Sequence, residues 1–370
     1  MLFGVLSAMF TPWTLAASAL TLLVYYAWTK TRLKHEGSNI PPFPAPAKPF
    51  LGHSLLLKGD ILDNLAWMRK KTGDIYSLNL FGQHWIVVNG YENLKEVLVK
   101  HADKTQDRPL SLASKVLKED NHGLITSTGR NFKEQRMITN TILRDFGMGK
   151  NIMAEKVALE VQTFIETLES YEEKPTDVHQ IVSAAVCNII CSILVGHRSR
   201  RKCLRKSKRM LEPPARPPSQ TCPKLRYLTA VIRETQRLAG VSPLGTRAVS
   251  QSFELQGYLI PEGSQLFINL NSALHDQSSW ENPLQFRPER FLDANGDVLK
   301  PGEFLPFGLG RHNCVGEALA RTELDLFLAS MFQRFRFEPE NPTQLPPLKG
   351  VLTINLSPQT FKVKFVGRNK

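Results

Sequence analysis

The segment from residue 307 to residue 316 constrains this chain more than any other part of its sequence. It reads F-G-L-G-R-H-N-C-V-G, a cysteine on a glycine-punctuated loop, and a predicted amphipathic helix from 317 to about 334 follows it. Gly310 and Gly316 allow tight turns and close approach to a flat ligand, because glycine has no Cβ. The helix N-terminus favours a thiolate at Cys314. A thiolate held in this way suits an axial ligand of haem iron, and the alternative is an ordinary buried cysteine.

Two further motifs precede this loop along the chain. Glu234 and Arg237 form E-x-x-R inside a predicted helix from Leu225 to Leu238, so the acid and the base lie on one helix face and can pair. Such a pair on its own is usually a solvated surface ion pair. The second motif, F-R-P-E-R-F, occupies residues 286–291 in a proline-rich, irregular segment. Its Arg290 could complete a Glu-Arg-Arg triad, a contact that the sequence itself does not show.

The order and separation of the three motifs resemble the cytochrome P450 superfamily. The resemblance implies a mainly α fold with small β-sheets (α+β) and haem b as the cofactor. It implies that Cys314 is the iron ligand and that Phe307 and Gly310 lie at the cofactor. The Glu-Arg-Arg triad is then assigned to holding the haem-side core and not to catalysis.

The resemblance extends into the N-terminal half of the chain. Residues 129–136, G-R-N-F-K-E-Q-R, look like the family's C-helix motif W-x-x-x-R, whose aromatic and arginine side chains commonly donate to a haem propionate. Phe132 stands where tryptophan is usual, so one indole N–H donor is absent, whereas Arg136 matches the motif. The alternative for Arg136 is ordinary surface charge.

Two more residues are implied as partners of the haem propionates. Residues 243–247, P-L-G-T-R, look like the strand after the family's K-helix, which places Arg247 at a propionate. His312 stands two positions before the predicted ligand, where the family usually has arginine. Histidine donates to a carboxylate more weakly and in a pH-dependent way.

The N-terminus predicts a membrane anchor over residues 1–29. These residues carry no charged side chain, and Leu2 to Trp28 is long and apolar enough to span a bilayer. Lys30, Arg32 and Lys34 follow, which leaves the bulk of the chain in the cytosol. A cleaved signal peptide is the weaker alternative, because no basic residue precedes the apolar run. Residues 30–53 form a basic and proline-rich hinge, as in microsomal members of the family, which implies the endoplasmic reticulum membrane.

Cysteine content and composition indicate a globular protein of a reducing compartment. At 370 residues and 42% hydrophobic content, the chain can bury a substantial core. Five cysteines without a C-x-x-C pair argue against disulfide or zinc frameworks. Cys187 and Cys191, four residues apart on an apolar helical stretch, are predicted to be core residues that ligate no metal.

Hydrophobic periodicity predicts a series of regular elements. Helices are expected at 61–71, 91–101, 132–143, 153–168 and 178–195, a hairpin at 75–88, strands at 252–259 and 265–269, and a terminal hairpin of 351–356 with 361–366. Residues 107–122 are expected to form a long loop, where the family has its first substrate-recognition segment.

Residues 197–224 do not fit the resemblance. Between the predicted haem-domain parts at 54–196 and 225–370, members of the family have several helices, and five helices with loops would need on the order of a hundred residues. The chain has 28 there, so part of the F-to-J helical region is missing. The distal helix with its A/G-G-x-x-T pattern is missing as well. The nearest string, A-G-V-S at 239–242, lacks the threonine, so no catalytic residue is identified on the distal side.

A basic run replaces the missing helices. Eight of its residues are basic, namely Arg198, Arg200, Arg201, Lys202, Arg205, Lys206, Lys208 and Arg209. Binding of nucleic acid is the least favoured of three interpretations, because no aromatic residue is interleaved. An acidic redox partner or anionic lipid is the second. The favoured interpretation is a junction left by alternative splicing, a gene-model error or a decayed gene.

The resemblance implies monooxygenation of lipophilic substrates such as fatty acids, steroids or xenobiotics. O2 would be one substrate, and an NADPH-dependent flavoprotein reductase at the membrane would supply electrons. The alternative is a catalytically inactive, truncated form that binds haem or the reductase at the membrane without turnover.

Overall fold

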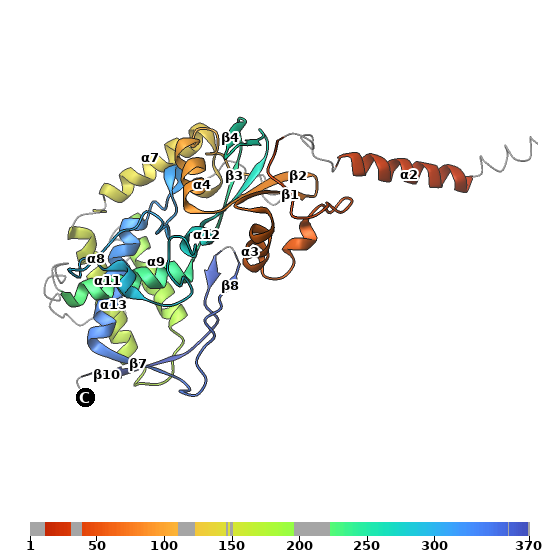
Figure 1. Ribbon diagram of the computed structural model, residues 1–370. Helices are drawn as coiled ribbons and strands as arrows, with labels where there is room; N and C mark the ends of the chain where they lie inside the picture. Colours follow the sequence, from red (N-terminus) through yellow and green to blue (C-terminus); the bar gives the residue numbers. More distant parts are fainter. Residues whose placement is uncertain are drawn as a thin grey trace, which may run out of the picture. The chain divides into compact units, whose positions relative to one another are not determined.

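A computed structural model describes residues 12–30, 39–109, 123–145, 147–148, 151–195, 223–353 and 355–368 (Figure 1). The protein is rich in helix and has small β-sheets, which confirms the predicted fold class. The chain divides into two compact units. The first comprises Met1–Asp120 with Leu244–Ser272, and the second comprises Asn121–Pro243 with Ala273–Lys370.

The first unit is built on a mixed sheet with strand order β1-β2-β6-β3. Strands β1 (Ile75–Leu80) and β2 (Gln83–Val88) form the predicted hairpin. Strand β6 (Gln265–Asn269) runs parallel to β2 and antiparallel to β3 (Leu244–Ala248). Helix α3 (Ile61–Thr72) begins at the side-chain cap of Asp60 and buries one apolar face against the sheet. Helix α4 (Tyr91–Lys95) continues as a π-helical turn, Glu96–Lys100.

The predicted strand at 252–259 is wrong in one respect. It is two antiparallel strands, β4 (Phe253–Leu255) and β5 (Tyr258–Ile260). The chain reverses at Gln256 and Gly257, whose φ angles are +51° and +79°. Two consecutive left-handed residues form the tight turn that hairpins favour, and the apolar pattern alone does not reveal it.

The second unit contains most of the helices: α6 (Gly123–Thr126), α7 (Gly129–Asp145), α8 (Asn151–Glu169), α9 (Val178–Val195), α11 (Pro223–Ala239) and α13 (Glu317–Arg334). The short helix α12 (Leu270–Leu274) crosses the boundary between the units. The predicted helices in these regions are confirmed within a few residues. Their common core joins α8, α9 and α13, for example through the edge-on contact of Phe164 with Phe327.

Two side-chain expectations for these helices are wrong. Helix α13 was expected to be amphipathic, but residues 320–326 are all half-buried, because the helix packs against both α8 and α11. Cys187 and Cys191 were expected in the core, but both thiols are exposed. Their spacing on the helix places them opposite Ala185 and Ile189, which are buried.

The predicted terminal hairpin also pairs differently. Strand β8 (Val351–Leu352) pairs with β9 (Leu356–Ser357), whereas β10 (Val363–Gly367) pairs antiparallel with β7 (Phe335–Pro339). Phe365 of β10 makes edge-on contacts with Phe335 and Phe337 of β7. These aromatic contacts stabilise the long-range pairing.

Three expectations fall outside the described residues. They concern most of the loop at 107–122, all but the last two residues of the basic junction at 197–224, and residues 1–11 of the predicted anchor. The later part of that anchor forms helix α2 (Pro12–Lys30). Within the described ranges, no helix combines the length and the apolar character needed to cross a membrane.

Candidate functional site

The cysteine loop is a tight, hydrogen-bonded turn that ends at helix α13. The Cys314 N–H donates to the carbonyl of Phe307 at 2.9 Å, and the thiol is exposed to solvent. Gly308 and Gly310 have φ angles of +76° and +74°, the left-handed region that favours glycine. Gly316 has a φ of −91°, so the expectation that it provides a glycine-dependent turn is wrong. The loop therefore presents an accessible sulfur directly before the first turn of a helix.

Helix α7 holds this loop through Arg136. Its Nη1 donates to the backbone carbonyl of Asn313 at 3.0 Å, and its Nη2 donates to the Asn313 side-chain oxygen. Burial lowers the pKa of Arg136, and its electrostatic interaction with Cys314 opposes this effect. The guanidinium is thus close enough to interact electrostatically with the sulfur while it fixes the preceding residue.

A second contact between helix α7 and the cysteine loop is made by Phe132 and His312. Phe132 lies one helical turn before Arg136 on α7. The rings of Phe132 and His312 stack with centroids 3.9 Å apart, and Phe132 is buried. The second unit therefore brings together four of the predicted cofactor-site residues, namely Phe132, Arg136, His312 and Cys314. Asn313 was missed from the sequence, and only its place beside Cys314 could have signalled its role.

In the first unit, Arg247 is a buried cation on strand β3. Its side chain donates to the carbonyl of Thr246 at 2.7 Å, and Arg108 donates to the same oxygen at 2.9 Å. Burial, together with the neighbouring charge of Arg108, lowers the pKa of Arg247 to about 9. Among the residues that the structure describes, no carboxylate pairs with Arg247. A buried guanidinium without a countercharge is costly, so the position suits an anionic ligand group. Sequence reasoning missed Arg108, which belongs to no recognised motif.

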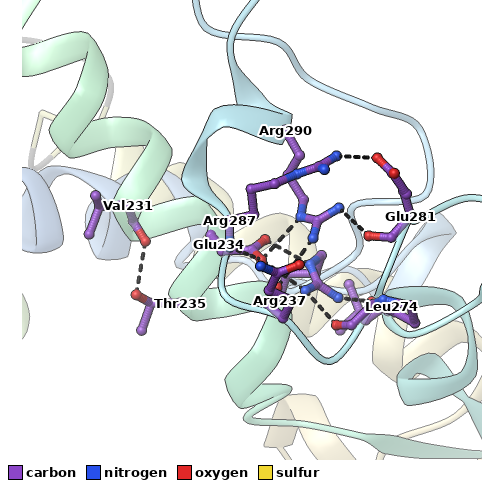
Figure 2. A network of polar contacts seen from close by, with 10 residues as sticks. Val231, Glu234, Thr235, Arg237, Leu274, Glu281, Arg287 and Arg290 are labelled. Atoms are coloured by element: carbon purple, nitrogen blue, oxygen red, sulfur yellow. Dashed lines mark hydrogen bonds and ion pairs between the residues drawn. The ribbon is translucent and has the colours of Figure 1, made fainter.

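Glu234, Arg237 and Arg290 meet in the second unit, and Figure 2 shows their network. Arg237 donates from Nε and Nη2 to the two carboxylate oxygens of Glu234 at 2.8 and 2.9 Å. Arg290 Nε and the backbone N–H of Arg287 donate to the same carboxylate at 3.1 and 3.0 Å. Burial by itself would raise the pKa of Glu234, but the hydrogen bonds and charges of its partners outweigh burial and lower it.

Arg237 also fastens the irregular segment to helix α11. It donates to the carbonyls of Leu274 and Pro283, both at 2.7 Å, and its guanidinium lies over the ring of Trp280. Arg237 and Glu234 are fully buried. Every contact in this network is internal, so the triad can position the chain but presents no group to a ligand.

Taken by itself, each unit has residues that fit part of a haem group. The iron of haem can be ligated by a cysteine sulfur, which requires an accessible thiol. The two propionates are negatively charged and require cationic partners. The second unit supplies the exposed Cys314 thiol with Arg136 beside it. In the first unit, Arg247 is a buried cation that has no carboxylate partner among the described residues, which suits an anionic group such as a propionate.

Comparison with known proteins identifies the class that this loop and fold define. The sequence model of the cytochrome P450 family matches residues 41–212 and 199–365. The chain therefore belongs to the cytochrome P450 family, and by family it is a haem monooxygenase with haem b as its cofactor.

Curated relatives in family 2 are similar along nearly the whole chain. Cytochrome P450 2K4 of Oncorhynchus mykiss is 28% identical, with 93% of this chain and 95% of the relative covered. Cytochrome P450 2D19 of Callithrix jacchus and cytochrome P450 2D6 of Homo sapiens are each 26% identical, with 91% of this chain and 95% of the relative covered.

The alignments also show that this chain is internally shorter than its relatives. The comparison with cytochrome P450 2K4 extends over 486 positions, whereas the chain has 370 residues. More than a hundred aligned positions thus have no counterpart here. The two matches to the family model overlap at residues 199–212, a stretch that begins inside the basic run. This is the place where the sequence predicts the missing helices.

Proposed function

We propose that Cys314 is the axial thiolate of a haem monooxygenase that oxidises lipophilic substrates. The observation that carries the proposal is the exposed Cys314 thiol, held at the start of α13 with the Arg136 guanidinium near it. When bound, haem supplies the activation of O2 that allows one oxygen atom to enter a C–H or C=C bond. Cys314 would hold the iron and supply electron density to it, and Arg136 fixes the loop through Asn313.

The propionates are assigned to Arg136, Arg247 and His312, with Phe307, Gly310 and Phe132 in contact with the cofactor. Arg247 supports this assignment through its buried position without a carboxylate partner in the described residues. Charge-assisted hydrogen bonds to carboxylates are roughly twice as strong as neutral ones. Glu234, Arg237 and Arg290 hold the irregular segment and take no part in the chemistry.

We assign the N-terminal residues 1–29 to an anchor in the endoplasmic reticulum membrane, followed by the hinge at 30–53 and a cytosolic haem domain. Residues 54–196 and 225–370 form the two parts of that domain, and 197–224 join them. An NADPH-dependent flavoprotein reductase supplies electrons, and fatty acids, steroids or xenobiotics are the substrate classes.

The test is a difference spectrum of the reduced, carbon monoxide-bound protein. We expect a thiolate-type Soret band for the full chain, loss of that band in Cys314→Ser, and its retention in Cys187→Ser as the matched control. A chain without the band when loaded with haem would overturn the assignment of Cys314.

A second candidate is the inactive form that binds haem or the reductase without turnover. The alignment gap of more than a hundred positions favours it, together with the lack of an A/G-G-x-x-T pattern in the sequence. NADPH, reductase and a panel of lipophilic substrates separate the two candidates. Product formation that Cys314→Ser abolishes supports the monooxygenase, and a thiolate-type band without product supports the inactive form.

A further inference from the structure

We propose that the exposed apolar face of helix α9 is a binding surface for anionic lipid membranes. This face comprises the exposed residues Cys187, Ile190 and Cys191, with the half-buried Val186 at its edge. The opposite side of the helix, with Ala185 and Ile189, is buried against α8. The proposal does not depend on haem or on Cys314.

Helix α9 is unusually apolar for a helix with one side in solvent. Its sequence, VHQIVSAAVCNIICSILV, contains no acidic or basic residue apart from His179. Ile190 is 42% exposed, and the Cys187 and Cys191 thiols are exposed with their sulfurs 3.9 Å apart. A helix that is apolar on all sides is normally buried or in contact with lipid. In helix α9 only the side with Ala185 and Ile189 is buried, and the side with Cys187, Ile190 and Cys191 is exposed.

The internal gap explains why this face is uncovered. The two matches to the family model meet at residues 199–212, immediately after the end of α9 at Val195. The extra residues of the relatives therefore enter the chain at this end of the helix. Without them, the described part of the second unit packs α9 on α8 and leaves the opposite face in solvent.

Charge favours a lipid surface over a second copy of the chain. Eight Lys and Arg residues lie between residues 198 and 209, directly after α9 in the sequence. Such a cluster is attracted to anionic headgroups. Burial of apolar area and electrostatic attraction to anionic lipids both strengthen binding at a membrane interface, and the α9 face and the basic run that follows it in the sequence offer one of these each. Two copies joined through α9 would instead bring two clusters of like charge together.

The reactivity of the Cys187 and Cys191 thiols shows whether a ligand or partner occupies this face, because a bound partner slows their modification. The full chain is labelled with a water-soluble maleimide, alone and with vesicles of phosphatidylcholine containing phosphatidylserine, and modification at each cysteine is read by peptide mass mapping. We expect phosphatidylserine vesicles to slow labelling of Cys187 and Cys191, and pure phosphatidylcholine vesicles to have a smaller effect. Protection that depends on protein concentration without vesicles would identify a second copy as the occupant and overturn the proposal. Equal labelling with and without anionic vesicles would also overturn it.

Two variants separate the apolar and the charged contributions. Ile190→Glu is expected to remove the protection, whereas Leu159→Glu, at a similarly exposed position on α8 (40% against 42%), is the control that retains it. Replacing Arg200, Arg201 and Lys202 with glutamine is expected to weaken vesicle protection by roughly fivefold for each charge removed. Unchanged protection in both Ile190→Glu and the glutamine variant would refute the lipid surface, and far-ultraviolet circular dichroism checks that each variant is folded.

Discussion

Phe132 of helix α7 stacks on His312 of the cysteine loop, with ring centroids 3.9 Å apart and planes 19° from parallel. His312 lies two residues before Cys314, so the stack holds the loop at a point close to the sulfur. An aromatic ring at position 132 therefore has a packing role that is separate from the N–H donor that tryptophan would supply. The stack explains how phenylalanine can occupy this position.

Phe132→Trp is expected to slow haem loss. The indole keeps the stack and adds one N–H donor, and a hydrogen bond to a charged group contributes roughly 1.5–3 kcal/mol. Haem dissociation is measured by transfer to an excess of a haem-scavenging protein. Phe132→Leu, which removes the ring, should lose haem faster than the wild type. If the tryptophan variant loses haem as fast as the leucine variant, position 132 does not face the cofactor.

Glu234→Gln is expected to destabilise the protein by about 3–5 kcal/mol, because it leaves two buried arginines without their countercharge. Urea unfolding measures the change. Glu281→Gln is the matched control, since Glu281 pairs with Arg287 at 2.7 Å on a side chain that is 69% exposed. Such a surface pair contributes roughly 0–1 kcal/mol. Similar losses in the two variants would contradict the structural role of the triad.

The same carboxylate predicts a pH dependence at acidic pH. The pKa of Glu234 is lower in the folded protein than its usual value of 4.5, so its ionised form stabilises the folded state. This contribution is complete above the unfolded pKa and is lost as the pH falls through the folded pKa. Unfolding free energies at pH 7 and pH 4 should therefore differ more for the wild type than for Glu234→Gln. If the difference between pH 7 and pH 4 is equal in the wild type and in Glu234→Gln, groups other than Glu234 determine the acid dependence of stability.

Arg247→Met is expected to have opposite effects on the haem-free protein and on haem binding. Burial lowers the pKa of Arg247 from its ordinary value to about 9, so holding its charge costs the folded state at most about 4–5 kcal/mol. This cost is present at neutral pH and declines as the pH rises above about 9. The variant should raise the free energy of unfolding without haem at pH 7, and weaken haem affinity because an anion loses its partner. Weaker affinity without the gain in stability would show that Arg247 carries no uncompensated charge.

Gly308→Ala and Gly316→Ala are expected to differ although both change the cysteine loop. At Gly308 the φ of +76° would cost alanine roughly 1–2 kcal/mol. At Gly316 the φ of −91° suits alanine, whose Cβ would make an ordinary 3.8 Å contact with the Cys314 sulfur. Thermal unfolding of both variants checks the difference. A larger loss at Gly316 would mean that close approach of a ligand, and not backbone strain, requires that glycine.

Local order along the chain was largely predictable from the sequence. Helices α3, α8 and α11 follow apolar periodicity, α9 follows a long apolar run, and the hairpin β1–β2 follows strand alternation. The pairing of β10 with β7 was not predictable, because it depends on which distant aromatic residues meet Phe365. The exposure of Cys187 and Cys191 was mispredicted for a related reason. A helix residue is buried only if another element packs on its face. An apolar sequence does not show whether such an element is present.

The sequence by itself determined the family, through the spacing of its three motifs, and it located the internal gap at the basic run. It also named Cys314, Arg136 and Arg247. Only the tertiary structure placed Arg136 on Asn313, 177 residues away, and left Arg247 buried with no carboxylate partner among the described residues. Motifs are local and survive in a linear string, whereas the charge and burial of a side chain depend on neighbours that only folding brings together.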